Sequence, residues 1–140
     1  MREYIRHPSS IPLEVKIADL PGPQSEYLNN VSLGGLSFRS KHELETGAQI
    51  TIRIPLLREG IQVSGQVVWC KKRSKDYEVG VAFRDKEEAF RTRMVEQICH
   101  IEQYRNEVLE HERRQLTSEQ AAMEWIKKFA GSFPELIAED

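Results

Sequence analysis

The sequence predicts a mainly β domain, an antiparallel barrel or sandwich, followed by α-helices. In the first 85 residues, several short runs alternate apolar and polar side chains, and Gly, Pro or polar turns separate them. From about residue 86 to 115 there is no Gly or Pro, and apolar residues recur every three or four positions. We therefore expect two parts: a β domain over residues 1–85 and a helical extension over residues 86–140.

The strand predictions follow from alternation of period two, which is typical of strands with one buried face. A loop is expected at Pro21-Gly22-Pro23 and a turn at residues 58–60. Short strands at this even spacing favour an antiparallel barrel or sandwich. The segments expected to form strands are residues 11–17, 36–38, 50–54, 61–69 and 77–83.

The first helix is predicted from apolar residues that follow one another at steps of three or four. About 30 residues of helix would be about 45 Å long, which is more than a small barrel needs for cover. The helix is expected either to fold back on the barrel or to pair two protomers. The apolar residues on this face are Phe90, Met94, Ile98, Ile101, Tyr104 and Val108.

A second helix is predicted to begin at Thr117, because Thr117 and Gln120 fit a capping box. Gly131 is placed to end it. Its apolar stripe is expected to pack on the preceding helix or on a dimer mate, or else to dock another protein. The stripe consists of Ala121, Ala122, Trp125, Ile126 and Phe129, and Phe133, Pro134, Leu136 and Ile137 continue the apolar character beyond it.

Composition excludes several classes of protein. Residues 1–86 carry 13 Lys and Arg against 10 Asp and Glu, and residues 87–140 carry 7 against 12. The first balance is too small for a nucleic-acid-binding protein. The chain has no apolar run long enough to insert into a membrane and no secretory signal, so we expect a cytoplasmic protein with Cys70 and Cys99 reduced. Neither metal-ligand spacing nor a nucleophile–base pair is present, so we expect no metal site, cofactor or enzymatic activity.

Two clusters of residues indicate a divided binding site for a nucleotide. Arg2 and Arg6 lie four apart at the N-terminus, and guanidinium groups bind phosphates, hydrogen-bond to the guanine edge and stack on purines. Asn30 and Ser32 alternate, so their side chains point the same way and offer hydrogen bonds to a base. Gly35 then permits close approach to the backbone.

Arg2-Glu-Tyr-Ile-Arg6 followed by Asn30-Val-Ser-Leu-Gly-Gly35 resembles the two-part motif of the PilZ family, over roughly residues 2–85. The resemblance implies a six-stranded antiparallel β-barrel whose N-terminal arm clasps cyclic di-GMP. It assigns Arg2 and Arg6 to phosphate and guanine, Asn30 and Ser32 to guanine, and Gly35 to close approach. Trp69 lies in a strand where an aromatic ring could line the pocket, although barrel core is the simpler interpretation.

The expected function is therefore that of a bacterial cyclic di-GMP receptor that relays the signal to a downstream protein. A homodimer through the long helix is a further expectation. The alternative from another class is a nucleotide-independent scaffold or adaptor that acts through its helical tail. The downstream process could be motility, adhesion, exopolysaccharide output or virulence.

Overall fold

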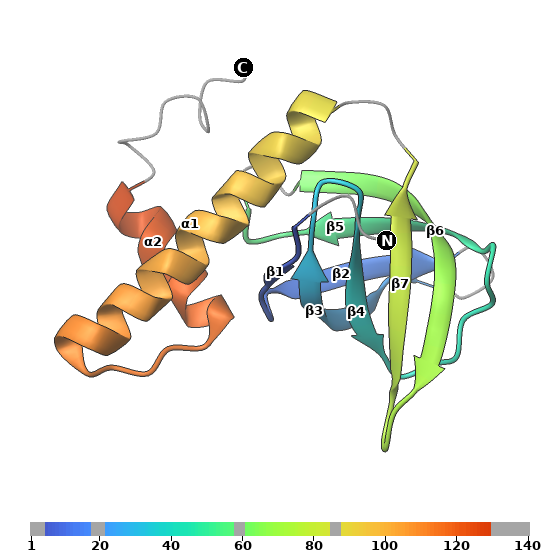
Figure 1. Ribbon diagram of the computed structural model, residues 1–140, viewed down its shortest axis with the longest axis horizontal. Helices are drawn as coiled ribbons and strands as arrows, with labels where there is room; N and C mark the ends of the chain where they lie inside the picture. Colours follow the sequence, from blue (N-terminus) through green and yellow to red (C-terminus); the bar gives the residue numbers. More distant parts are fainter. Residues whose placement is uncertain (1–4, 18–21, 58–60, 85–87, 130–140) are drawn as a thin grey trace.

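The computed structural model describes residues 5–17, 22–57, 61–84 and 88–129. Within these residues, six strands form a closed antiparallel barrel in the order β3-β2-β5-β6-β7-β4, closed by pairing of β4 with β3, and β1 adds to the edge of β3 (Figure 1). The elements are β1 (His7–Pro8), β2 (Pro12–Ile17), β3 (Gln24–Val31), β4 (Gly35–Ser40), β5 (Gln49–Ile54), β6 (Ile61–Lys72), β7 (Tyr77–Phe83), α1 (Glu88–Glu112) and α2 (Ser118–Phe129). The predicted mainly β barrel followed by helices is confirmed.

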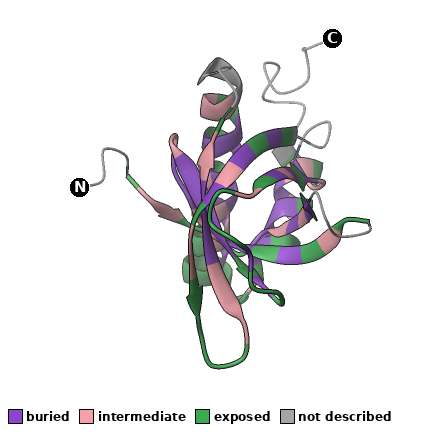
Figure 2. Ribbon diagram, turned by 90° about the vertical axis from the view of Figure 1, so that its right-hand side faces the viewer, coloured by how far each residue is buried: buried purple, intermediate pink, exposed green. Residues whose placement is uncertain are grey.

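The barrel core consists of the inward residues of each alternating strand. In β2, Leu13, Val15 and Ile17 are buried, while Lys16 between them is exposed. Figure 2 shows the same alternation of buried and exposed positions along the strands. Burial of branched apolar side chains on one face is what stabilises such strands, at about 25 cal/mol per Å² of apolar surface.

Two β-bulges interrupt the alternation and change which residues face outward. One lies between Leu28 and Asn30 in β3, and the other between Val67 and Trp69 in β6. A bulge inserts one extra residue, so the residues after it change face relative to strict alternation. Strict alternation would put Trp69 on the inner face with Val67. The bulge instead makes it the neighbour of Gly80, and the interpretation of Trp69 as barrel core is wrong.

Helix α1 packs against the barrel along its predicted apolar face. Met94, Ile98 and Ile101 are fully buried, and they belong to the same continuous core as the inward residues of the strands. Tyr104 and Val108 are also buried, whereas the side chain of Phe90 lies outside the described residues. The helix therefore folds back on the barrel, as one of the two alternatives expected. Pairing of protomers through α1 stays a prediction.

Helix α2 packs on α1 and begins with the predicted capping box. The Gln120 N–H donates to Thr117 Oγ1 at 3.0 Å, and the Thr117 N–H donates to Gln120 Oε1 at 2.9 Å. The Trp125 ring is buried and stacks on His100 of α1, with ring centroids 5.9 Å apart. Ala121 and Ala122 are buried as well. Gly131 and the apolar residues from Phe133 to Ile137 lie outside the described residues.

Candidate functional site

The β3–β4 hairpin is held by Ser32, one of the predicted site residues. Ser32 is 4% exposed, and its backbone N–H donates to the Gly35 carbonyl at 2.8 Å. Its hydroxyl accepts a hydrogen bond from the Gly34 N–H at 3.2 Å and donates to the Gly35 carbonyl at 3.3 Å. Small side chains of this kind stabilise tight turns by bonding to the local backbone. The Ser32 hydroxyl therefore fixes the shape of the hairpin.

Gly35 lies at the tightest point between β4 and β7. A Cβ atom at this position would overlap the Val81 carbonyl oxygen and lie 3.3 Å from the Ala82 Cα. Both obstacles are backbone atoms, which cannot move without disturbing the pairing of Gly35 with Ala82. Close packing of β4 on β7 therefore requires glycine at position 35, a role that could not be predicted from the sequence.

Strand β1 places the N-terminal arm beside the end of β3 that leads into the β3–β4 hairpin. His7 pairs with Val31 and Pro8 with Asn30, and continuing this register by one residue beyond the ladder would bring Arg6 opposite Ser32. Opposed residues of an antiparallel pair share one face, and so do alternate residues of a strand. Arg6, Asn30 and Ser32 therefore belong to one face of the β1–β3 ribbon, and Arg6 is half-buried there. Arg2, the other predicted arginine, lies outside the described residues.

Asn30 presents a buried acceptor on this face. Within the part of the chain that the structure describes, its Oδ1 is shielded from solvent and has no hydrogen-bond partner. Unpaired buried acceptors are rare in folded proteins and cost about 1–3 kcal/mol. A ligand with an N–H donor would satisfy this atom.

A cross-strand row connects Asn30 to Trp69. Asn30 pairs with Ser37, Ser37 with Gly80, and Gly80 with Trp69, so the row crosses β3, β4, β7 and β6. The neighbours Val79 and Val81 face the core, which puts this row on the outer face of the barrel.

The Trp69 ring lies against Gly80, where a Cβ atom would come within 2.7 Å of the ring atom Cδ2. The Lys71 Nζ lies 5.1 Å from the centre of that ring. Trp69 is half-buried, so part of the ring remains accessible. The structure thus provides an aromatic surface at one end of the row and the Asn30 side chain at the other.

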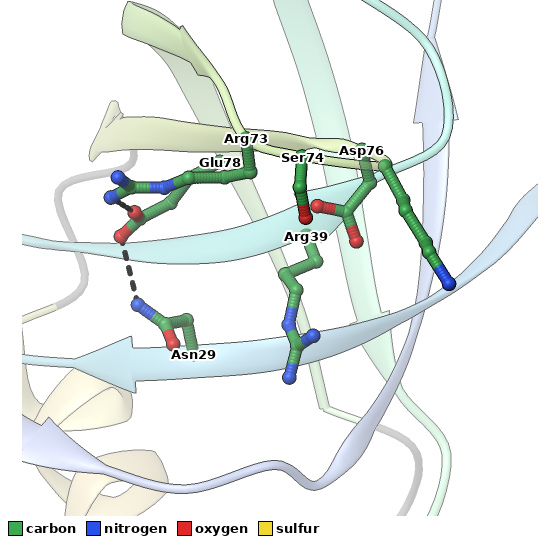
Figure 3. A pocket seen from close by; sticks show the side chains of 7 residues that line it. Asn29, Arg39, Arg73, Ser74, Asp76 and Glu78 are labelled. Carbon is green, nitrogen blue, oxygen red and sulfur yellow. Dashed lines mark hydrogen bonds and ion pairs between the residues drawn. The ribbon is translucent and has the colours of Figure 1, made fainter.

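A pocket of about 350 Å³ lies beside this row, at the end of the barrel formed by the β6–β7 turn (Figure 3). Glu78 lies between two donors: Asn29 Nδ2 donates to its Oε2 at 2.8 Å, and Arg73 forms an ion pair with it. Asn29 also donates to Ser37 Oγ at 3.2 Å, so the pocket is joined to the row. The pocket is also lined by Arg39, Ser74, Lys75 and Asp76.

Sequence reasoning did not select Asn29, because a bulge becomes visible only when the partners of β3 are known. Several groups elsewhere in the described part of the chain have shifted pKa values. Burial raises the pKa of the Glu26 carboxyl and that of the Cys99 thiol. Hydrogen bonds from Arg114 and Tyr104 lower the pKa of Glu124 to about 2. None of these groups is among the predicted site residues.

The described residues offer no group of three or more His, Cys, Asp or Glu that could hold a metal ion. None of the helices in the described part combines the length and apolar character needed to span a membrane.

Comparison with known proteins gives a family and a fold. The family model for the PilZ domain matches residues 1–99. No curated protein matches the chain. Among solved structures, the PilZ domain of YcgR from Escherichia coli, determined with c-di-GMP, aligns with a TM-score of 0.64 and 18% identity, covering 79% of this chain and 98% of that one.

Two longer proteins align over part of their length. YcgR from Escherichia coli in complex with c-di-GMP aligns with a TM-score of 0.59 and 22% identity, over 78% of this chain and 49% of YcgR. The inhibitor of motility MotI/DgrA from Bacillus subtilis aligns with a TM-score of 0.57 and 15% identity, over 73% of this chain and 50% of that protein. The chain thus spans about half the length of these two.

Proposed function

This chain belongs to the PilZ domain family, and from that membership we propose that it is a receptor for cyclic di-GMP. The nucleotide would bind on the outer face of the barrel, between the N-terminal arm and the β3–β4 hairpin. Arg2 and Arg6 would bind its phosphates and guanine, because guanidinium groups form paired hydrogen bonds with both. The proposal is supported by solved PilZ structures that contain this nucleotide.

The observation that carries the proposal is the register of β1 on β3. Continued by one residue, it would bring Arg6 opposite Ser32 and onto the face of Asn30 Oδ1, which is buried and has no hydrogen-bond partner among the described residues. Guanine has N–H donors on its Watson–Crick edge, and one of them would satisfy this acceptor. Ser32 and Gly35 would contribute to binding by fixing the shape of the hairpin, in addition to any contact that they make with guanine. Trp69 would offer its accessible ring for stacking on a base.

A calorimetric titration of the full chain with cyclic di-GMP tests the proposal. A charge-assisted bond contributes about 1.5–3 kcal/mol, so Arg6→Ala should weaken binding about 10- to 150-fold. Arg53→Ala is the matched control, since Arg53 lies on β5 and its exposed ion pair is with Glu14. Absence of heat with the wild-type protein, or equal affinities for the wild type and Arg6→Ala, would contradict the proposal.

The output of the receptor is proposed to pass through residues 86–140 to a downstream protein in the bacterial cytoplasm, with residues 1–85 as the sensing domain. The proposal uses the packing of α1 on the barrel, because a contact shared by both parts can transmit a change at the site. A homodimer would be a second route, open to test by sedimentation with and without nucleotide.

A nucleotide-independent scaffold is the second candidate function. It is favoured by Leu109 on α1 and Met123 on α2, which are 45% and 57% exposed although both are large and apolar. Replacing each with Ser leaves the proposed nucleotide site untouched. Loss of partner binding in these variants, together with a wild-type protein that does not bind cyclic di-GMP, would favour the scaffold over the receptor.

A further inference from the structure

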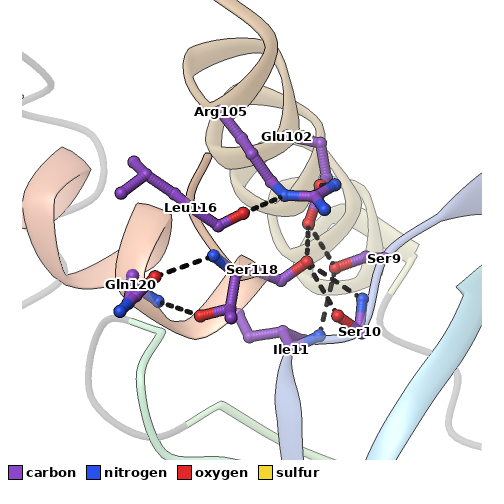
Figure 4. A network of polar contacts seen from close by, with 9 residues as sticks. Ser9, Ser10, Ile11, Glu102, Arg105, Leu116, Ser118 and Gln120 are labelled. Carbon is purple, nitrogen blue, oxygen red and sulfur yellow. Dashed lines mark hydrogen bonds and ion pairs between the residues drawn. The ribbon is translucent and has the colours of Figure 1, made fainter. Parts of the chain in front are cut away.

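We propose that Glu102 of α1 and Ser118 of α2 are positioning residues for the nucleotide-binding arm, although neither belongs to the proposed site. They hold Ser9 and Ser10, which directly follow the strand that carries Arg6 to the barrel. The inference rests on the proposed function and extends it to the helices. We call the four side chains Ser9, Ser10, Glu102 and Ser118 the arm latch (Figure 4).

The arm latch joins three distant parts of the chain through one carboxylate. Glu102 Oε2 accepts hydrogen bonds from the Ser9 and Ser118 hydroxyls, both at 2.7 Å. Ser118 Oγ in turn accepts from the Ser10 N–H and from the Ser10 hydroxyl, each at 3.1 Å. Each hydroxyl thus donates its single proton once, and the carboxylate serves only as an acceptor. Removal of Glu102 would leave the Ser9 and Ser118 hydroxyl protons without this acceptor, and removal of Ser118 would do the same to the two Ser10 donors.

These hydrogen bonds are largely shielded from water, so their loss would not be compensated by solvent. Ser9 is 7% exposed, Ser118 is 1% exposed, and the Glu102 side chain is 16% exposed. The Arg105 guanidinium donates to Glu102 Oε1 at 3.3 Å and to the Leu116 carbonyl at 2.7 Å. The carboxylate is therefore held on both oxygens, and the α1–α2 loop is held with it. Hydrogen bonds to charged groups are stronger than those between neutral groups, and they are stronger still when they are buried.

The arm needs this support because β1 is short. Among the described residues of the arm, His7 and Pro8 alone pair with β3, and the next backbone contact after β1 is a 3.3 Å bond from the Ser9 N–H to the Asn29 carbonyl. Two paired residues are too few to hold a strand in place alone. Ser9 lies three residues after Arg6, at most about 10 Å along the chain. Fixing Ser9 therefore restricts where the Arg6 guanidinium can reach.

Two consequences follow by thermodynamic linkage. If the arm latch orders the arm before the nucleotide arrives, its loss must weaken nucleotide binding, because ordering is then part of the binding step. Coupling between sites is reciprocal, so bound nucleotide must stabilise the docking of α2 by the same factor. The helices would thus register occupancy of the site through Glu102 and Ser118, which are not part of it.

The test uses the full chain as wild type, Glu102→Ala and Ser118→Ala, with Glu110→Ala as the control for loss of a carboxylate from α1. Each protein is titrated with cyclic di-GMP by calorimetry. Amide hydrogen exchange over residues 118–129 is then measured with and without saturating nucleotide. Both latch variants should bind at least about fivefold more weakly, the lower end of typical coupling, and the control should match the wild type. Nucleotide should slow exchange in α2 of the wild type and have no such effect in the latch variants.

The outcomes separate this inference from the proposed function. If the wild type does not bind the nucleotide, the proposed function fails and this inference fails with it. If all four proteins bind equally, the receptor stands and the positioning role is overturned. Ser118→Ala deletes one hydroxyl only, so its result decides the matter if circular dichroism shows that Glu102→Ala does not fold.

Discussion

Replacing Gly35 with Ala should destabilise the protein in the absence of any ligand. Gly35 opens β4 and pairs with Ala82, and a methyl group there would overlap the Val81 carbonyl oxygen. This oxygen belongs to the backbone of β7, between two other paired positions of the same ladder. Relief of the overlap would require β4 to move away from β7, which would weaken the closure of the barrel.

The size of the effect follows from the kind of atom that must move. Overpacking in a well-packed interior costs about 1–3 kcal/mol, and a rigid carbonyl puts this case near 3 kcal/mol. At about 4 °C per kcal/mol for a domain of this size, the Tm should fall by about 12 °C. Gly22→Ala supplies the control, because Gly22 has a φ of 71° and no atom within 4 Å of a Cβ. Its cost should be the backbone strain alone, about 1–2 kcal/mol.

The assay is urea unfolding of the ligand-free proteins, followed by circular dichroism. Gly35→Ala should unfold at clearly lower urea than both the wild type and Gly22→Ala, with an unchanged slope. The reasoning would be refuted if Gly35→Ala were as stable as the wild type and yet failed to bind cyclic di-GMP. In that case the missing side chain would serve the ligand and not the contact between strands.

Two further predictions concern stability against pH. The folded pKa of Glu124, about 2, lies below its ordinary value of 4.5, so the stability it adds is complete above 4.5 and lost as pH falls towards 2. Unfolding in urea across this range should show the decline for the wild type and a smaller one for Glu124→Gln; equal declines would contradict it. Burial raises the pKa of Glu26 above 4.5, so the wild type should lose stability as pH rises from 4.5 through the raised value. Glu26→Gln should therefore be the more stable protein at pH 7, and a less stable variant would show that the charged form is favoured.

The sequence predicted those elements whose pattern is set by burial on one side. The alternation of apolar and polar residues up to Lys16 and Ile17 predicted β2, because a strand on a barrel has one face toward solvent and one toward the core. The apolar face of α1 followed from spacing for the same reason. Strand β3 gave no such pattern, since its inward Glu26 is polar and its bulge lies within the strand.

The site likewise has features that the sequence predicted and features that it could not predict. The types of residue and their order along the chain predicted that Asn30 and Arg6 act together, and pairing of β1 with β3 places them on one face. The outward position of Trp69 could not be predicted, because it depends on a bulge at Val68 that only the partner strand reveals. The arm latch was equally hidden, as Ser9 and Glu102 are 93 residues apart and hydroxyl groups carry no periodic signal.

The most direct test of the central claim, that the arm and the β3–β4 hairpin form one nucleotide site, is a double-mutant cycle. Cyclic di-GMP is titrated by calorimetry into the wild type, Arg6→Ala, Asn30→Ala and the double variant. Each single variant should weaken binding about tenfold or more, because each side chain loses its own bond to the nucleotide, and a double variant that loses less than the product of the two factors would show that the two residues are coupled. A wild-type protein that releases no heat with the nucleotide, or a single variant that binds as tightly as the wild type, would contradict a single shared site.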